Sequence, residues 1–174
     1  MDKRLMLTSI SDIRKQIQDP TKGLPEEVFE LVTTLTPMVN VDLLIRDDDG
    51  RILMAWRDDE CTGKGWHIPG GIIRYKEKAE DRIQQTALKE LGTEVLILKG
   101  PIEINEIIVP QEVRGHFISL LYVCKLPDGF VIPPEALGDE TEPTAGVLKW
   151  HNKKPELVRG QDDIYKHIFT IIDI

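Results

Sequence analysis

Apolar and polar residues alternate with the period of a β-strand between residues 38 and 57. Val39, Val41, Leu43 and Ile45 are apolar, while Asn40 and Asp42 stand between them. The segment 47–50, Asp-Asp-Asp-Gly, has the composition of a tight turn. The pattern predicts a β-hairpin in which Asp42 and Asn40 share one face.

A helical period appears near both ends of the chain and in its middle. Residues 8–19 predict a helix with Thr8 or Ser9 as its cap, and residues 25–35 predict a second that opens on Pro25 and ends before Pro37. Residues 161–173 predict a closing helix. The longest helical pattern follows Pro69-Gly70-Gly71 and ends near Gly92.

The remaining apolar stretches predict strands separated by turns. They are residues 66–68, 72–74, 93–98, 102–109, 115–126 and 147–152, and a proline-rich and acidic loop spans 127–146. This order of elements predicts an α/β fold with an antiparallel or mixed sheet between helices. We expect the 127–146 loop to act as a lid over a site.

Length and composition indicate a single soluble domain. The chain has 174 residues, of which 41% are hydrophobic, and its apolar runs are too short to span a bilayer. The first twelve residues lack the apolar core of a secretory signal. Cys61 and Cys124 make no disulfide framework, so we expect a cytoplasmic protein without a membrane partner.

The charge balance limits the choice of ligand. A net charge of −8 argues against general nucleic-acid binding, which needs a basic surface. An anionic ligand would therefore need a local attraction, either a metal ion or a few placed arginines.

Glu90 is the residue that most needs an explanation. On a helical wheel it falls among Ala79, Ile83, Thr86 and Ala87, on the face that should be inward. An unpaired buried carboxylate costs several kcal/mol, so a salt bridge, a raised pKa or a bound cation must offset that cost. A hard divalent cation would also use the carbonyl of a preceding glycine, for which we choose Gly70.

Residues 70–93 resemble the signature of the Nudix hydrolases. Gly71, Glu77, Glu90 and Gly92 fall at their positions in that pattern, after a Pro69-Gly70-Gly71 entry. The resemblance implies the Nudix fold, a mixed sheet sandwiched between helices (α/β/α). It places the domain at 38–174, after an N-terminal helical extension at 1–37.

The sequence departs from the signature where other inner acids are expected. Gln85 and Thr86 replace Arg-Glu, and Lys89 replaces the first of two paired glutamates. Ala87 is smaller than the aliphatic residue expected at its position, and Thr93 replaces the final aliphatic residue of the signature. The chain in this respect resembles the GDP-mannose mannosyl hydrolase branch, whose similarly reduced signature implies one Mg²⁺, with Mn²⁺ as a possible substitute.

The same resemblance suggests the remaining site residues. Asp42 and Arg57 match a strand aspartate and a strand-end arginine that face the substrate, and Arg74 is a second candidate for binding phosphate. The branch's loop histidine has no counterpart before Trp150. We therefore expect Glu142 to act as the base, with Glu140 as the alternative.

Other polar and aromatic residues are secondary candidates for the site or are expected to be structural. Thr141 is a candidate to approach the metal, and Glu140 is again the alternative. His67 and His116 are expected to be structural. Trp66, Tyr75 and Phe117 are expected to fill the core rather than stack a base.

Three functions follow from these expectations. The first is Mg²⁺-dependent cleavage of the glycosyl bond of a nucleoside diphosphate sugar resembling GDP-mannose, which releases sugar and NDP. The second is cleavage of the pyrophosphate, which gives NMP and a sugar phosphate. The third is a nucleotide-binding domain without turnover. Members of this branch are commonly dimers, so the resemblance suggests a homodimer, with the N-terminal helices as a candidate interface.

Overall fold

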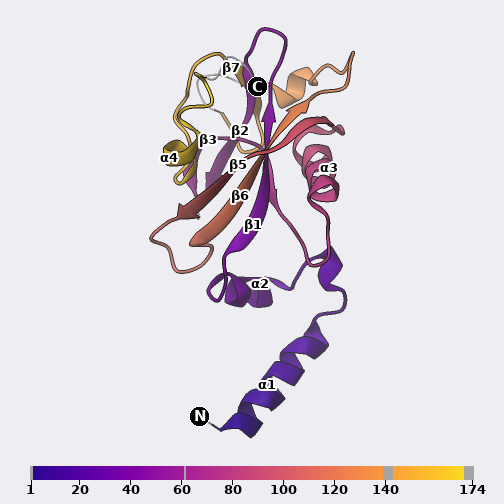
Figure 1. The fold of residues 1–174 in the computed structure, drawn as a ribbon, viewed down its shortest axis with the longest axis vertical. Coiled ribbons are helices and arrows are strands. Elements are labelled where there is room, and N and C mark those ends of the chain that lie inside the picture. The colour runs from indigo at the N-terminus through magenta and orange to yellow at the C-terminus, as the bar shows by residue number, and fades with distance from the viewer. Residues whose placement is uncertain (1, 61, 139–142, 171–174) are drawn as a thin grey trace.

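The computed structural model describes residues 2–60, 62–138 and 143–170, and it has the predicted mixed α/β architecture (Figure 1). Two helices come first, followed by four strands, a third helix, three more strands and a last helix, with two short 3₁₀ turns at Pro20–Lys22 and Pro134–Ala136. The helices are α1 Lys3–Gln16, α2 Glu26–Thr33, α3 Ala79–Leu91 and α4 Gln161–Tyr165. The strands are β1 Met38–Ile45, β2 Ile52–Asp59, β3 Gly63–His67, β4 Gly70–Ile72, β5 Leu96–Ile108, β6 His116–Lys125 and β7 Leu148–His151.

The strands form two sheets. One has the order β4-β1-β6-β5, in which β1 and β6 are parallel and the other pairs antiparallel. The other has the order β3-β2-β7 and is antiparallel. The predicted hairpin of residues 38–57 is wrong. Only the bridge between Arg46 and Ile52 joins its arms, because β1 and β2 then separate into different sheets.

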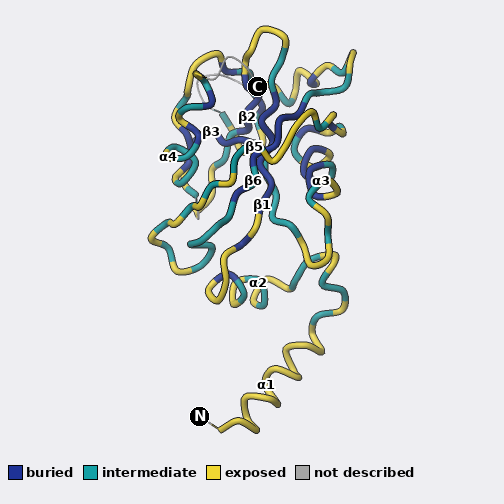
Figure 2. Tube along the Cα trace, viewed as in Figure 1, coloured by how far each residue is buried: buried dark blue, intermediate teal, exposed yellow. Residues whose placement is uncertain are grey.

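Two apolar cores lie on opposite faces of β1. Val41, Leu43 and Ile45 point to α3, where they pack with Ile83 and Ala87. Leu44 points to the other face and packs with α4 and the second sheet. The burial is deepest where the strands converge at the centre of the molecule (Figure 2). Alternation along β1 therefore supplies both cores, and Asp42 falls on the α4 side.

Helix α1 begins earlier than its predicted start. Asp2 caps it by accepting a hydrogen bond from the Arg4 amide at 2.9 Å, whereas the Thr8 hydroxyl donates to the Arg4 carbonyl inside the helix. The helix has no buried residue and extends away from the body of the molecule (Figures 1 and 2).

Two other predicted boundaries change. The strands expected at 93–98 and 102–109 form one strand, β5, interrupted by register shifts between Ile97 and Glu103. The closing helix is only α4, followed by turns to residue 170. In the described ranges, no helix is long and apolar enough to cross a membrane.

Candidate functional site

A cavity of about 430 Å³ lies where the N-terminal half of the β1–β6 sheet meets α3, β2, β3 and the start of α4. Its size is in the range of small-molecule sites. From the predicted site it contains Asp42, Arg57, Gly70 and Glu90. Its basic lining residues are Arg57, Arg82, Lys89, Arg114 and Arg159.

Glu90 faces this cavity from α3. Its side chain is 18% exposed, and its Oε2 is buried without a hydrogen-bond partner. The Nε2 atom of His67 lies 3.5 Å from that oxygen, which is an ion-pair distance only if the imidazole is protonated. The carboxylate thus has an unused acceptor inside a polar cavity, a costly arrangement that a cation would relieve.

The glycine turn before α3 is shaped by close contacts. A Cβ on Gly70 would lie 2.3 Å from the Oδ1 atom of Asp42, and a Cβ on Gly71 would lie 2.3 Å from the Oγ1 atom of Thr86. No larger residue fits either position without a shift. The turn can approach β1 and α3 this closely because both positions are glycine.

Asp42 lies at the bottom of a buried polar network and is 2% exposed. It accepts hydrogen bonds from Asn40 at 2.8 Å, Ser119 at 2.5 Å and Tyr165 at 2.6 Å. Burial raises the pKa of this carboxyl, and the three hydrogen bonds oppose that rise. Its oxygens are thus taken by the protein itself, although Asp42 borders the cavity.

Glu77, unlike Glu90, has hydrogen-bond partners for its carboxylate within the protein. Its carboxylate accepts from the Nε and Nη2 atoms of Arg82 at 2.8 and 2.7 Å and from the Arg74 amide at 2.8 Å. Burial alone would raise the pKa of Glu77, but the Arg82 and Arg74 hydrogen bonds outweigh it and lower the pKa. This bidentate pair ties the loop before α3 to the helix and fits a structural role.

The two arginines predicted to bind phosphate lie in different places. Arg57 lines the cavity, and its Nη2 atom lies 3.1 Å from His67 Nε2. Arg74 is exposed, and it is absent from the described lining of the cavity. The structure therefore brings Arg57, but not Arg74, to Glu90.

The other predicted residues divide into three groups. Glu140, Thr141 and Glu142, like Cys61, lie outside the described residues. His116 is partly exposed and bonds Glu106 at 3.0 Å, away from the lining. Of the aromatic residues expected in the core, Trp66 is buried there, Tyr75 is exposed, and Phe117 borders the cavity.

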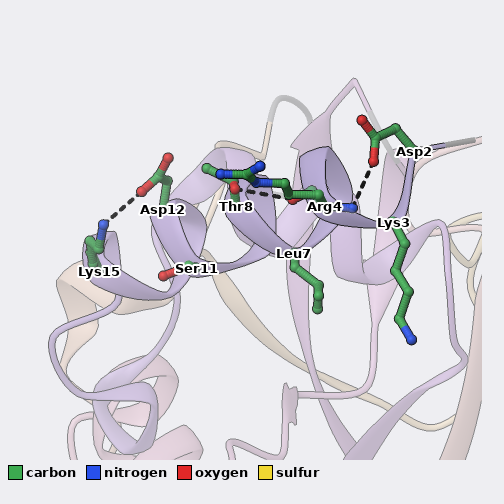
Figure 3. Close-up of a pocket in the computed structure, with 8 residues that line it drawn as sticks. All are labelled: Asp2, Lys3, Arg4, Leu7, Thr8, Ser11, Asp12 and Lys15. Atoms are coloured by element: carbon green, nitrogen blue, oxygen red, sulfur yellow. Dashed lines mark hydrogen bonds and ion pairs between the residues drawn. The ribbon is translucent and has the colours of Figure 1, made fainter.

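A second hollow lies along α1, as Figure 3 shows. Its eight lining residues all belong to this helix or its cap, and Lys15 pairs with Asp12 at 2.7 Å within it. Because one exposed helix cannot enclose a ligand, this hollow has no part in the site.

Several site residues escaped the sequence analysis. Ser119 stands in an apolar strand opposite Asn40 in the parallel register, and Tyr165 stands beside the apolar stripe of α4. Polar residues on the same face of two buried strands were a usable signal for this network. No sequence pattern pointed to Arg114, Arg159 or Gln161, because each lies in a loop or at the start of a helix.

The donors present fit one hard cation better than several. Within the described ranges, no cluster of three or more His, Cys, Asp or Glu residues could hold a metal ion. Glu90 Oε2 and the Thr86 hydroxyl are buried without a hydrogen-bond partner among the described residues, and Gly70 lines the same cavity. Mg²⁺ commonly keeps several waters and takes only one or two carboxylates, so this sparse set suits it.

The sequence is similar to a known domain family and to a known protein. The Nudix domain family matches residues 36–166. The chain is 34% identical over 123 residues to the low-salt glycan biosynthesis protein Agl8 of Haloferax volcanii, which covers 68% of this chain and 78% of that protein.

Solved structures share the fold. A MutT Nudix hydrolase from Burkholderia pseudomallei superposes with a TM-score of 0.55 at 20% identity, over 79% of this chain and 99% of that one. A UDP-X diphosphatase superposes with a TM-score of 0.53 at 16% identity, over 96% of this chain and 80% of that one. The signature around Gly71 and Glu90, the match over residues 36–166 and the shared fold lead to one conclusion: this chain belongs to the Nudix hydrolase family.

Proposed function

We propose that this Nudix hydrolase cleaves the glycosyl bond of a nucleoside diphosphate sugar with the help of one Mg²⁺. The observation that carries the proposal is the isolation of Glu90. Its buried Oε2 lacks a hydrogen bond, while the positions around it on α3 that face the cavity hold Gln85, Thr86 and Lys89. One carboxylate supports one cation more readily than several.

The residues that would hold the metal are Glu90 and Gly70, and Thr141 is a further candidate beyond the described residues. When bound, Mg²⁺ would neutralise charge on the diphosphate, which makes NDP a better leaving group. Mn²⁺ is a chemically similar substitute.

Arg57 is our choice to bind the diphosphate. Its planar guanidinium can donate two parallel hydrogen bonds to phosphate oxygens, and it lines the same cavity as Glu90. Lys89 and Arg159 add positive charge to the lining in a chain whose net charge is −8. A local basic surface of this kind explains how an acidic protein could attract an anionic substrate.

In the proposed reaction, water attacks the anomeric carbon. Its oxygen forms the new bond, its proton passes to Glu142 or Glu140, and the bond from carbon to the phosphate oxygen breaks with its electron pair remaining on NDP. Attack at phosphorus would need more positive charge on the phosphates than the single metal ion held by one carboxylate provides. The glycan-related name of the Haloferax volcanii relative is consistent with a sugar nucleotide as substrate.

The test is a panel of NDP-sugars in ¹⁸O-labelled water, with and without Mg²⁺, and mass spectrometry of the products. We expect the label in the free sugar and none in NDP. Label in NMP or in sugar phosphate would favour the pyrophosphatase alternative. Nucleotide binding without any product would favour a binding domain.

We also propose a cytoplasmic homodimer that pairs through α1. Met6, Ile10, Ile13 and Ile17 follow one another at intervals of four, three and four residues, the spacing of a coiled-coil contact, and we call them the apolar seam. Met6, Ile10 and Ile13 are all exposed in the single chain. A second copy of the same helix would cover them.

A further inference from the structure

We propose that Gln161 and Tyr165 of the C-terminal helix α4 are positioning residues that hold the Pro69–Gly71 turn from two sides. The inference rests on the proposed function, because it gives this turn the task of presenting the Gly70 carbonyl to a metal ion. Neither residue belongs to the α3 signature, and they lie more than eighty residues beyond the turn in the chain.

Gln161 holds the strand that enters the turn. Its Oε1 accepts from the Ile68 amide at 2.8 Å, and its Nε2 lies 3.5 Å from the Ile68 carbonyl as a weak donor. Ile68 is fully buried and directly precedes Pro69. The amide of Gln161 thus replaces the strand partner that the backbone lacks at this residue.

Tyr165 holds the other side through Asp42. Its hydroxyl donates to Asp42 Oδ2 at 2.6 Å and lies 2.7 Å from the Ser119 hydroxyl. Asp42 pairs with Gly70 in the antiparallel register, and its Oδ1 occupies the space where a Gly70 side chain would be. Any movement of this carboxylate would therefore change the space available to Gly70.

The helix itself is firmly attached, so it can act as a fixed reference. Backbone hydrogen bonds join Val158 to Trp66 at 3.0 Å and Trp66 to Glu156 at 2.9 Å, just before α4. Tyr165 and Ile168 are fully buried in the second core. The turn is thus held between β1 and α4, and Leu43 adds a hydrogen bond from its amide to the Pro69 carbonyl at 2.9 Å.

Groups that orient metal ligands usually change metal affinity or activity by about 10- to 100-fold when removed. We expect Tyr165→Phe, which removes one oxygen atom and keeps the ring, to weaken Mn²⁺ binding about tenfold and to lower kcat. Gln161→Leu should act in the same direction. Gln161→Glu, which keeps the acceptor for the Ile68 amide, should recover most of the loss.

Gln84 provides a matched control. Its side chain also clamps one residue by two hydrogen bonds, to the amide and carbonyl of Val95 at 3.0 and 2.9 Å, but it lies outside the cavity lining. Gln84→Leu should lower thermal stability about as much as Gln161→Leu does. It should leave Mn²⁺ affinity and kcat unchanged.

The experiment measures Mn²⁺ binding by electron paramagnetic resonance on the full chain, together with kcat, KM and thermal unfolding. Because Gln161 borders the cavity and Tyr165 does not, Tyr165→Phe is the decisive variant. Wild-type Mn²⁺ affinity and kcat in a folded Tyr165→Phe protein would overturn the inference. If the wild type itself bound no Mn²⁺, the proposed metal site would fail, and the inference would fall with it.

Discussion

At the scale of single residues, Glu90 and Glu77 show how the surroundings of a carboxylate decide its use. Both belong to the same signature, but Glu77 is fully engaged by Arg82 and Arg74 while Glu90 keeps a buried oxygen free. The helical wheel already pointed Glu90 inward. The arginine partner of Glu77 could not be predicted, because Arg82 occupies a position where the signature has no arginine.

The first prediction concerns Glu90→Gln, which keeps the size of the side chain and removes its charge. If metal stabilisation supplies on the order of 4 kcal/mol, the rate should fall roughly a thousandfold, since each 1.36 kcal/mol is tenfold. Steady-state kinetics at limiting Mg²⁺ check this, with the exposed Glu94→Gln as a control expected to keep wild-type rates. Full turnover by Glu90→Gln would remove Glu90 as the metal ligand.

The second prediction compares the two candidate arginines. Arg57→Ala should lower kcat/KM about 10- to 150-fold, the equivalent of about 1.5–3 kcal/mol for a hydrogen bond to a charged group. Arg74→Ala should change it less than about threefold, because Arg74 lies outside the described lining of the cavity. Kinetics on the same NDP-sugar decide between them. A larger loss for Arg74→Ala would reverse the assignment.

At the scale of elements, the sequence predicted most helices and strands but not how the strands pair. The turn at 47–50 indicated a hairpin, yet β1 and β2 carry apolar residues that serve two cores and so enter different sheets. Alternation indicates that a strand has two faces, and it does not identify the neighbour. The family resemblance suggested that Asp42 faces the substrate; Asp42 borders the cavity, and its carboxylate also accepts a hydrogen bond from Tyr165 of α4, a partner that alternation along β1 could not identify.

The third prediction is the pH dependence of the Glu77–Arg82 ion pair. Because the pKa of Glu77 is lowered in the folded state, the pair stabilises the protein fully above the usual pKa of 4.5 and loses that effect as the pH falls through the lowered value. Glu77→Gln should therefore lower the free energy of unfolding by about 2 kcal/mol near neutral pH.

Urea unfolding at neutral pH and in acid measures this difference, which should shrink below pH 4.5. Glu80→Gln is the control, since Glu80 is exposed in the first turn of α3 and should cost less than about 1 kcal/mol at either pH. An equal loss for Glu77→Gln at both pH values would mean that the ion pair is not its cause.

The fourth prediction concerns the 127–146 loop, whose acids we propose as the base. Replacing Glu140 and Glu142 together by alanine should lower kcat about 10²- to 10⁴-fold, the usual contribution of a general base, and remove the acid limb of the pH–rate profile. Alanine at Glu135, in the same loop, is the control. An unchanged profile would contradict both acids as the base and would direct the search to His116 or to unassisted water.

At the scale of the whole molecule, the apolar residues that remain exposed are as informative as those that are buried. The two apolar cores contain residues from the strands, α3 and α4. No residue of α1, by contrast, is buried in the single chain. Sequence alone predicted that the N-terminal segment is helical. It could not show that this helix would lie away from the domain, because amphipathic helices also pack on sheets.

The last prediction follows from that exposed helix. If a second copy covers the apolar seam, the double variant Ile10→Gln, Ile13→Gln should dissociate the dimer, since burial of each isoleucine contributes about 1.5–3 kcal/mol. Light scattering after size exclusion, over a range of protein concentrations, measures the mass. Leu35→Gln is the matched control, because Leu35 is an exposed apolar residue beyond α1. Loss of the dimer in that control, a dimer that survives the double variant, or a wild type that is monomeric throughout would each contradict pairing through α1.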